Sequence, residues 1–246
     1  MKLLLAGELG NSNASDPRTL KEIWPRLVSL GLNTVLAPIY WDLLEPEEGR
    51  YDFGLLDELL QLARANEQQL ILLWFGTWKN SMSCYAPHWV KLDQQRFPRA
   101  RLYDGSALEI LTAFSQENLD ADRRAFAQLM RHLKAEDADH HTVICIQVEN
   151  EVGMLEQARD ACEAANAAFS AAIPEDFALA LAERPCPIGD RLKRKLSNGR
   201  ATWTEAFGEG PASDRSFRPI SSPSTSMPSQ KSASANTTFQ CSSMPH

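Results

Sequence analysis

The chain has 246 residues, enough for one α/β barrel or for one to two ordinary domains. A net charge of −7 and a hydrophobic content of 43% are typical of a globular protein and leave no basic patch suited to nucleic acid. No apolar run reaches the roughly 18 residues of a membrane helix, so we expect neither nucleic acid nor a membrane as a partner.

Targeting and cysteine signals are weak. The apolar start, residues 1–7, is too short for a signal peptide and is followed at once by Glu8, so the chain as read is expected to stay in the cytoplasm. The five cysteines have no metal-ligand spacing, and no metal is expected. Cys145 lies inside a predicted strand, where a buried thiol is expected.

Strand-like and helix-like segments alternate along the first 150 residues. Short apolar runs predict four strands, at residues 2–6, 33–39, 70–75 and 142–148. Apolar side chains at helical spacing predict helices at residues 16–31, 53–65 and 118–134. This alternation indicates an α/β fold with a parallel sheet and crossover helices. Residues 76–116 show little periodicity, and loops of that length are usually functional.

The first helix has a clear start and an ambiguous middle. Asp16 suits the N-cap and Pro17 the first helical position. Pro25 lies inside the helical pattern and predicts a break, so that the main helix begins near Trp24.

The pattern weakens after residue 151, and no fifth strand is predicted. Helices are expected at residues 158–172, 175–184 and 191–196. Residues 211–246 hold 11 Ser and 5 Pro but no Leu, Val, Trp, Tyr, Glu or Gly, so they cannot bury a core and are expected to be disordered. This tail is either a natural Ser-rich extension or the product of a reading-frame shift. The shift is favoured because the tail begins abruptly after a well-patterned segment, residues 201–210.

The most informative motif is Glu149-Asn150-Glu151, directly after the fourth predicted strand. In (β/α)₈ barrels the chemistry is carried at the C-terminal ends of the strands. A glutamate there can protonate a glycosidic oxygen, and an asparagine can hydrogen-bond a sugar hydroxyl. The alternative is that these polar residues only cap the following helix or are solvated.

Six segments together carry a family resemblance. They are residues 7–12, 33–41, 44–53, 73–81, 87–90 and 147–153. In order and spacing they resemble the catalytic barrel of retaining β-galactosidases of glycoside hydrolase families 35 and 42, most closely a bacterial family-35-like group. The resemblance covers roughly residues 1–210. It implies a (β/α)₈ TIM-barrel glycosidase fold of which about the first half is present, with residues 1–210 as a partial catalytic domain and residues 211–246 as the tail.

The resemblance also implies site residues. Glu151 matches the general acid/base, and Asn150 matches the sugar-contacting residue before it. Glu149 matches the first acid of the motif and either supports the site or is structural. Further substrate-binding residues are expected after strands one to three: Glu8, Asn11, Glu45, Trp78, Lys79 and Asn80. Glu45 could equally cap a turn, and Trp78 could stack on a sugar or lie in the core.

The implied reaction is hydrolysis of a terminal β-galactoside or oligosaccharide by double displacement, with no cofactor. Its nucleophile comes from a seventh strand that this chain lacks; Glu205 and Glu209 are the only late carboxylates in patterned sequence. We therefore expect little or no activity. A non-catalytic carbohydrate-binding fragment and a related barrel glycosidase acting on β-glucosides or β-glucans stay open as alternatives. The resemblance is compatible with relatives that are exported from the cell. The unpaired strand edges of a half-barrel favour oligomers or aggregates.

Overall fold

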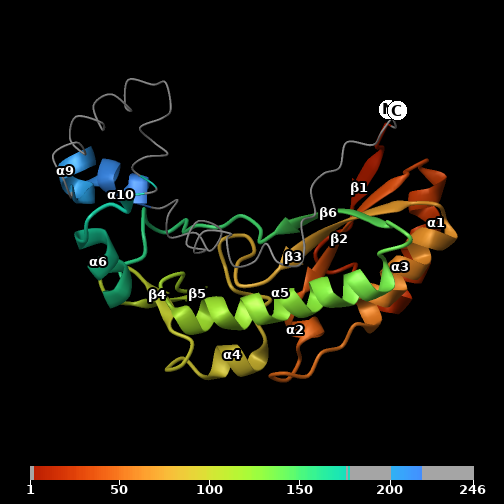
Figure 1. Ribbon diagram of the computed structural model, residues 1–246, viewed down its shortest axis with the longest axis horizontal. Coiled ribbons are helices and arrows are strands. Elements are labelled where there is room, and N and C mark those ends of the chain that lie inside the picture. The colour runs from red at the N-terminus through yellow and green to blue at the C-terminus, as the bar shows by residue number, and fades with distance from the viewer. Residues whose placement is uncertain (1–2, 176, 178–200, 218–246) are drawn as a thin grey trace. The chain divides into compact units, whose positions relative to one another are not determined.

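The computed structural model describes residues 3–175, 177 and 201–217 (Figure 1). Contacts divide the described residues into two compact units. Unit 1 contains residues 3–97 and 117–152, and unit 2 contains residues 98–116 and the described residues from 153 onward. No helix in these described ranges is long and apolar enough to cross a lipid bilayer.

Unit 1 is built on a four-stranded parallel sheet in the order β1-β2-β3-β6. The strands are β1 (Ala6–Glu8), β2 (Thr34–Tyr40), β3 (Gln69–Phe75) and β6 (Val143–Val148). The four predicted strands and their parallel arrangement are thus confirmed, although β1 begins later than expected. The fold is α/β and corresponds to part of a TIM barrel.

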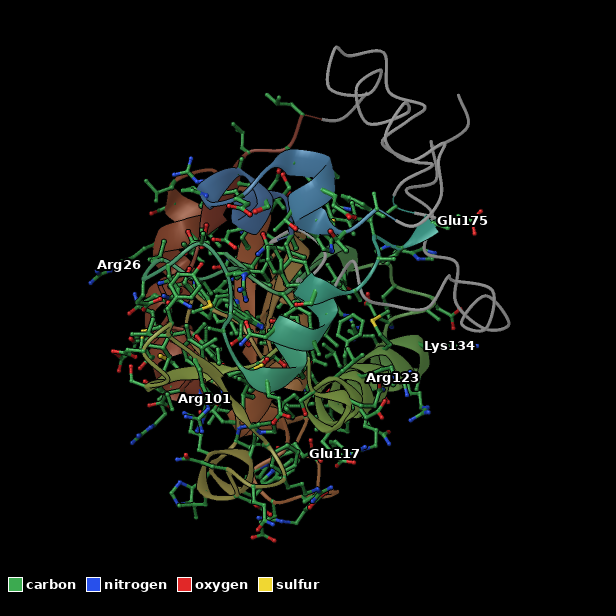
Figure 2. The ribbon with its side chains drawn as sticks, turned by 90° about the vertical axis from the view of Figure 1, so that its left-hand side faces the viewer. Arg26, Arg101, Glu117, Arg123, Lys134 and Glu175 are labelled. Atoms are coloured by element: carbon green, nitrogen blue, oxygen red, sulfur yellow. The ribbon has the colours of Figure 1, made fainter. Side chains whose placement is uncertain are left out.

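Three helices follow strands and pack against this sheet: α1 (Pro17–Ser29), α3 (Gly54–Ala65) and α5 (Gln116–Glu136) (Figure 1). The helix α5 contacts the sheet through Phe126, whose ring lies 5.8 Å from that of Trp74 on β3. Its charged residue Arg123 is exposed and lies on the outside of the helix (Figure 2). The division into an apolar and a charged side is what the spacing of its residues predicted.

The helix α1 runs without interruption through Pro25, so the predicted break is wrong. Its start is as predicted, since Asp16 accepts a hydrogen bond from the Arg18 backbone N–H and Pro17 is the first helical residue. Trp24, beside the proline, is fully buried, and its indole N–H donates to Gln68 Oε1 over 2.8 Å. This burial holds the helix together where the proline removes one backbone donor.

Cys145 is exposed, and the expectation of a buried thiol is wrong. The reason is topological: β6 is an edge strand of the described sheet, with a neighbour, β3, on one side only. A strand with apolar residues throughout is fully buried only when both edges and both faces are covered.

The stretch 76–116, expected to be a loop, contains regular structure. Within this stretch lie α4 (His88–Leu92) and an antiparallel hairpin of β4 (Arg99–Arg101) and β5 (Ala107–Leu111). Another short helix, α2 (Trp41–Leu44), follows β2 earlier in the chain. These elements are too short to show a period in the sequence. Unit 2 adds α6 (Glu163–Ser170), within the predicted helix 158–172.

Unit 2 also contains α9 (Trp203–Phe207) and α10 (Pro211–Phe217). The helix α10 lies in the segment expected to be disordered, so folded structure continues past residue 210. Phe217 is buried among aromatic rings, stacking on Phe114 with 5.4 Å between centroids, and Asp214 pairs with Arg159 over 2.9 Å. The expected helices 175–184 and 191–196 and the rest of the tail lie essentially outside the described residues.

Candidate active site at the ends of β3 and β6

The turns that follow β3 and β6 lie side by side in unit 1. The two strands are parallel and pair from Leu70–Val143 to Trp74–Val148, with a register shift between Leu70 and Ile71, so their carboxyl ends meet at the same edge of the sheet. The Asn150 N–H donates to the Trp78 carbonyl over 3.3 Å, and the Ser81 N–H donates to the Glu151 carbonyl over 3.1 Å. Residues 76–81 and 149–151 therefore form one surface.

Glu149 is buried beneath this surface. Its Oε2 accepts from the Trp78 N–H over 2.7 Å, and its Oε1 accepts from the Thr77 N–H over 3.2 Å. Burial first, and then the adjacent Asp122 carboxylate, to which it is hydrogen-bonded, raise the pKa of Glu149 well above its ordinary value. Glu149 thus fixes the turn after β3, which supports the structural alternative for this residue.

Asp122 of α5 is the partner that the sequence analysis missed. Its carboxylate accepts from the Trp74 indole N–H over 2.8 Å and from the Thr77 hydroxyl over 2.5 Å. The signal was present, because Asp122 falls on the buried side of α5, four residues after Asn118 and seven residues before Leu129. Gly76 completes the arrangement: a Cβ there would lie 2.3 Å from the Trp74 nitrogen.

Lys79 links the two turns. Its ammonium group donates to Asn150 Oδ1 and to Asn80 Oδ1, each over 2.7 Å, and lies 4.7 Å from the centre of the Phe75 ring. An ammonium group has three N–H donors, so these two bonds leave one for an incoming hydroxyl. Because Lys79 occupies the oxygen of the Asn150 side chain, the amide NH₂ of that residue is turned away from the ammonium group and can donate.

Glu151 ends the motif and is exposed. Its φ of +49° is in the left-handed region, as are the values of +63° at Glu149, +51° at Asn80 and +58° at Ser81. Such conformations are uncommon outside glycine, and they cluster at functional sites when the surroundings enforce them. Here both turns contain them, and each turn holds the other through backbone hydrogen bonds.

The Trp78 ring is only 5% exposed, so its faces are not open for a sugar to stack on. Its indole nitrogen is buried and has no hydrogen-bond partner among the described residues. The structure therefore favours the core alternative for Trp78, and Trp74 within β3 is fully buried as well. The Trp78 backbone still belongs to the site through its bonds with Glu149 and Asn150.

The remaining predicted site residues, Glu45, Glu8 and Asn11, belong to other segments of unit 1. Glu45 is buried, and its carboxylate accepts from the Trp41 indole over 2.9 Å and from the Gly49 N–H over 2.8 Å, which supports the turn alternative. Glu8 is exposed at the end of β1, at the same edge of the sheet. Asn11 uses its backbone carbonyl to accept from the Tyr40 hydroxyl over 2.6 Å. In the part of the chain that the structure describes, no three or more His, Cys, Asp or Glu are grouped so as to hold a metal ion.

Two sequence comparisons match the chain to beta-galactosidases. The sequence model of glycoside hydrolase family 42, described as beta-galactosidase, matches residues 11–184. The chain is 26% identical over 193 residues to beta-galactosidase Bga of Halorubrum lacusprofundi, covering 76% of this chain and 25% of that protein.

Solved structures resemble the fold. A beta-galactosidase from the psychrophilic Marinomonas ef1 matches with a TM-score of 0.52 at 20% identity, over 87% of this chain and 29% of that one. The polyextremophilic enzyme of Halorubrum lacusprofundi matches with a TM-score of 0.50 at 24% identity, over the same shares of the two chains. The Rahnella sp. R3 enzyme, also with a TM-score of 0.50, is 22% identical, over 79% of this chain and 26% of its own.

These comparisons select between the two families that the motifs resemble. The motifs resemble a family-35-like group most closely, whereas the matching model is that of family 42. The chain spans between a quarter and a third of the length of the relatives above. Because the family model covers well over half of its residues, the chain belongs to glycoside hydrolase family 42, and what it carries is part of that family's catalytic barrel.

Proposed function

We propose that the ends of β3 and β6 form the sugar-binding and acid/base part of a β-galactosidase site. The observation that carries this proposal is the hydrogen bond from the Lys79 ammonium group to Asn150, the residue next to Glu151. It fixes a donor-rich pair beside an exposed carboxyl group at the carboxyl end of a barrel strand, where barrel enzymes carry their chemistry.

Each residue has a distinct part in this proposal. The Asn150 amide and the third N–H of Lys79, which has no partner among the described residues, donate to hydroxyl groups of the sugar, and Asn80, exposed and bonded to Lys79, lies at the rim. Glu151 donates a proton to the departing glycosidic oxygen and later takes one from water. Glu149 positions the others, since it holds the backbone of the turn that presents Lys79.

Double displacement also needs a carboxylate about 5–5.5 Å from the acid/base to attack the anomeric carbon. The described residues supply four parallel strands of the barrel, and the family's nucleophile is expected on the seventh. Glu205 does not substitute for it, because its carboxylate caps α9 by accepting from the Thr202 N–H over 2.8 Å. The proposal is therefore that this chain binds β-galactosides and does not hydrolyse them at a substantial rate.

Two measurements on the purified 246-residue chain test the proposal. Titration calorimetry with methyl β-galactoside and methyl β-glucoside is expected to show binding that favours the galactoside and is lost in Asn150→Ala. Gln61→Ala, on the exposed side of α3, is the matched control and should bind as the unaltered chain does. Release of nitrophenol from nitrophenyl β-galactoside is expected to stay near the uncatalysed rate.

The outcomes separate the alternatives. Preference for the glucoside would favour a related barrel glycosidase specificity, and no heat with either sugar would overturn the proposed site. Substantial turnover that disappears in Glu151→Gln and persists in Glu22→Gln would show that a nucleophile is present after all.

A further inference from the structure

Both edges of the sheet in unit 1 are unpaired within the described part of the chain. In the order β1-β2-β3-β6, β1 bonds only to β2 and β6 only to β3. An open strand edge offers a row of backbone donors and acceptors to any strand that can pair with it. Since all four strands are parallel, the β6 edge of one copy and the β1 edge of another can continue the same parallel sheet.

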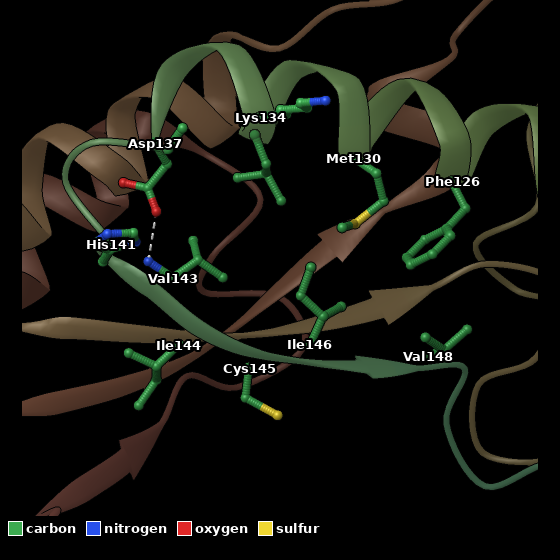
Figure 3. A pocket seen from close by; sticks show the side chains of 12 residues that line it. Phe126, Met130, Lys134, Asp137, His141, Val143, Ile144, Cys145, Ile146 and Val148 are labelled. Carbon is green, nitrogen blue, oxygen red and sulfur yellow. Dashed lines mark hydrogen bonds between the residues drawn. The ribbon is translucent and has the colours of Figure 1, made fainter. Parts of the chain in front are cut away.

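Beside the β6 edge lies a mostly apolar cavity of about 400 Å³ between this strand and α5, whose lining also includes Lys134, Asp137 and His141. Figure 3 shows Val143, Ile146 and Val148 on the side of β6 that faces α5, with Ile146 and Val148 near Met130 and Phe126. Val148 is 47% exposed although it lies in this apolar setting. Exposed apolar surface next to an unpaired strand is typical of a protein interface.

The β1 edge carries side chains that match this cavity. Residues 3–5 are three consecutive leucines, with Leu3 71% and Leu5 51% exposed. They are held to β2 by Asn33, whose side chain bonds to the Leu3 carbonyl and the Leu5 N–H. Gly7 pairs with Val35 and Val35 with Leu70, which is on the same face of β3 as Trp74, the residue that contacts α5; Gly7 therefore lies on the helix-covered side of the sheet. Side chains alternate along an extended chain, so Leu5 and Leu3 fall on that same side.

We propose that two copies of this chain close into an eight-stranded barrel, in which β6 of each copy pairs in parallel with β1 of the other. This pairing inserts Leu3 and Leu5 of one copy into the cavity between β6 and α5 of the other, on the matching face. The two junctions are related by a twofold axis, so both edges of both sheets are satisfied and no edge is left to extend the assembly. Eight strands also give a barrel whose interior side chains can fill.

The test is the mass of the full 246-residue chain in solution, measured by sedimentation equilibrium over a range of concentrations. The expected result is a dimer of about 55 kDa, twice the 27.5 kDa of one chain. Leu5→Lys and Val148→Glu alter exposed side chains at opposite edges, and each alone should shift the protein to monomer. Leu92→Lys, at a 71% exposed site on α4, should leave the dimer intact. Circular dichroism verifies that each variant is folded.

Mixing the two edge variants tests which edges meet. A dimer of Leu5→Lys with Val148→Glu has one unaltered junction, while the other junction carries both substitutions, so the mixture is expected to recover dimer that neither variant forms alone. A mixture that stays monomeric contradicts the β6–β1 pairing. A Cys145–Cys145 crosslink under mild oxidation, lost in Cys145→Ser, would place β6 against β6 and also contradict it. A monomeric or an indefinitely aggregating unaltered chain would overturn the proposal outright.

Discussion

Replacement of Glu149 tests whether this buried residue acts as a neutral or a charged group. The Glu149 carboxyl accepts from the Trp78 N–H over 2.7 Å and is hydrogen-bonded to Asp122. Two carboxyl groups in contact away from water share a proton. In Glu149→Gln, the amide oxygen can accept from Trp78 while the amide NH₂ donates to Asp122. The weaker 3.2 Å bond from Thr77 is lost, but the Thr77 N–H keeps Asp122 as acceptor at 2.9 Å.

The expected changes in the free energy of unfolding follow from this inventory. Glu149→Gln should cost less than about 1 kcal/mol, because only one long hydrogen bond disappears. Glu149→Ala orphans the buried Trp78 N–H and removes the proton donor of Asp122. Leaving a buried donor unsatisfied costs roughly 1–3 kcal/mol, and the unbalanced carboxylate adds to this.

The two variants also differ from the unaltered chain in pH dependence. The pKa of Glu149 is raised in the folded state, first by burial and then by Asp122, so the folded state holds a proton that the unfolded state releases. Its contribution to stability is fully present below the ordinary glutamate pKa and is lost as the pH rises through the folded-state pKa. In that window stability falls by at most about 1.4 kcal/mol per pH unit, and Glu149→Gln should remove this slope.

Urea unfolding of the three proteins between about pH 5 and about pH 9, followed by tryptophan fluorescence, measures both effects. Glu22→Gln, at an exposed site on α1, is the matched control and should behave as the unaltered chain. The reasoning is refuted if Glu149→Gln destabilises as much as Glu149→Ala, since Glu149 would then act as a charged carboxylate that needs both oxygens.

Four further predictions concern separate parts of the chain. Lys79→Met should weaken binding of methyl β-galactoside by roughly tenfold or more in calorimetry, because a charged donor is lost; unchanged affinity would remove Lys79 from the site. Pro25→Ala should raise the unfolding free energy by about 1–3 kcal/mol, since it restores a helical N–H inside α1, and a decrease would show that the proline is favourable there. Burial raises the pKa of Asp137, but hydrogen bonds including one from Arg64 lower it overall. The contribution of Asp137 to stability is therefore present above the ordinary aspartate pKa and is lost as the pH falls through the lower, folded-state pKa. An acid titration in which Asp137→Asn loses as much stability as the unaltered chain would contradict this. Phe217→Ala should destabilise unit 2 by about 3–5 kcal/mol, and intact near-ultraviolet circular dichroism and melting in this variant would show that α10 does not belong to the folded core.

Periodicity identified the sheet because the strands of unit 1 are long and apolar. β2 and β3 are buried along most of their length, and such runs are recognisable without knowledge of their partners. The exposure of Cys145 could not be predicted from periodicity, because it depends on the neighbouring strand that β6 lacks among the described residues. Pro25 shows the converse case, in which burial of Trp24 overrides a local preference.

The candidate site divides in the same manner. The position of Glu151 and Asn150 at a strand end follows from the sequence, because strand ends are local features. The bond between Lys79 and Asn150, 71 residues apart, and the burial of Glu149 against Asp122 arise only when β3, β6 and α5 come together. The sequence left Glu45 and Trp78 with two roles each, and hydrogen bonding and burial favour the structural role for both.

The central claim is that galactoside binds at the paired turns after β3 and β6, and amide chemical shifts test it most directly. Titration of the labelled chain with methyl β-galactoside is expected to shift the amides of residues 78–81 and 149–151 together and in a saturable manner. Shifts confined to other residues, or none at all in a folded protein, would contradict the assignment of this surface as the sugar site.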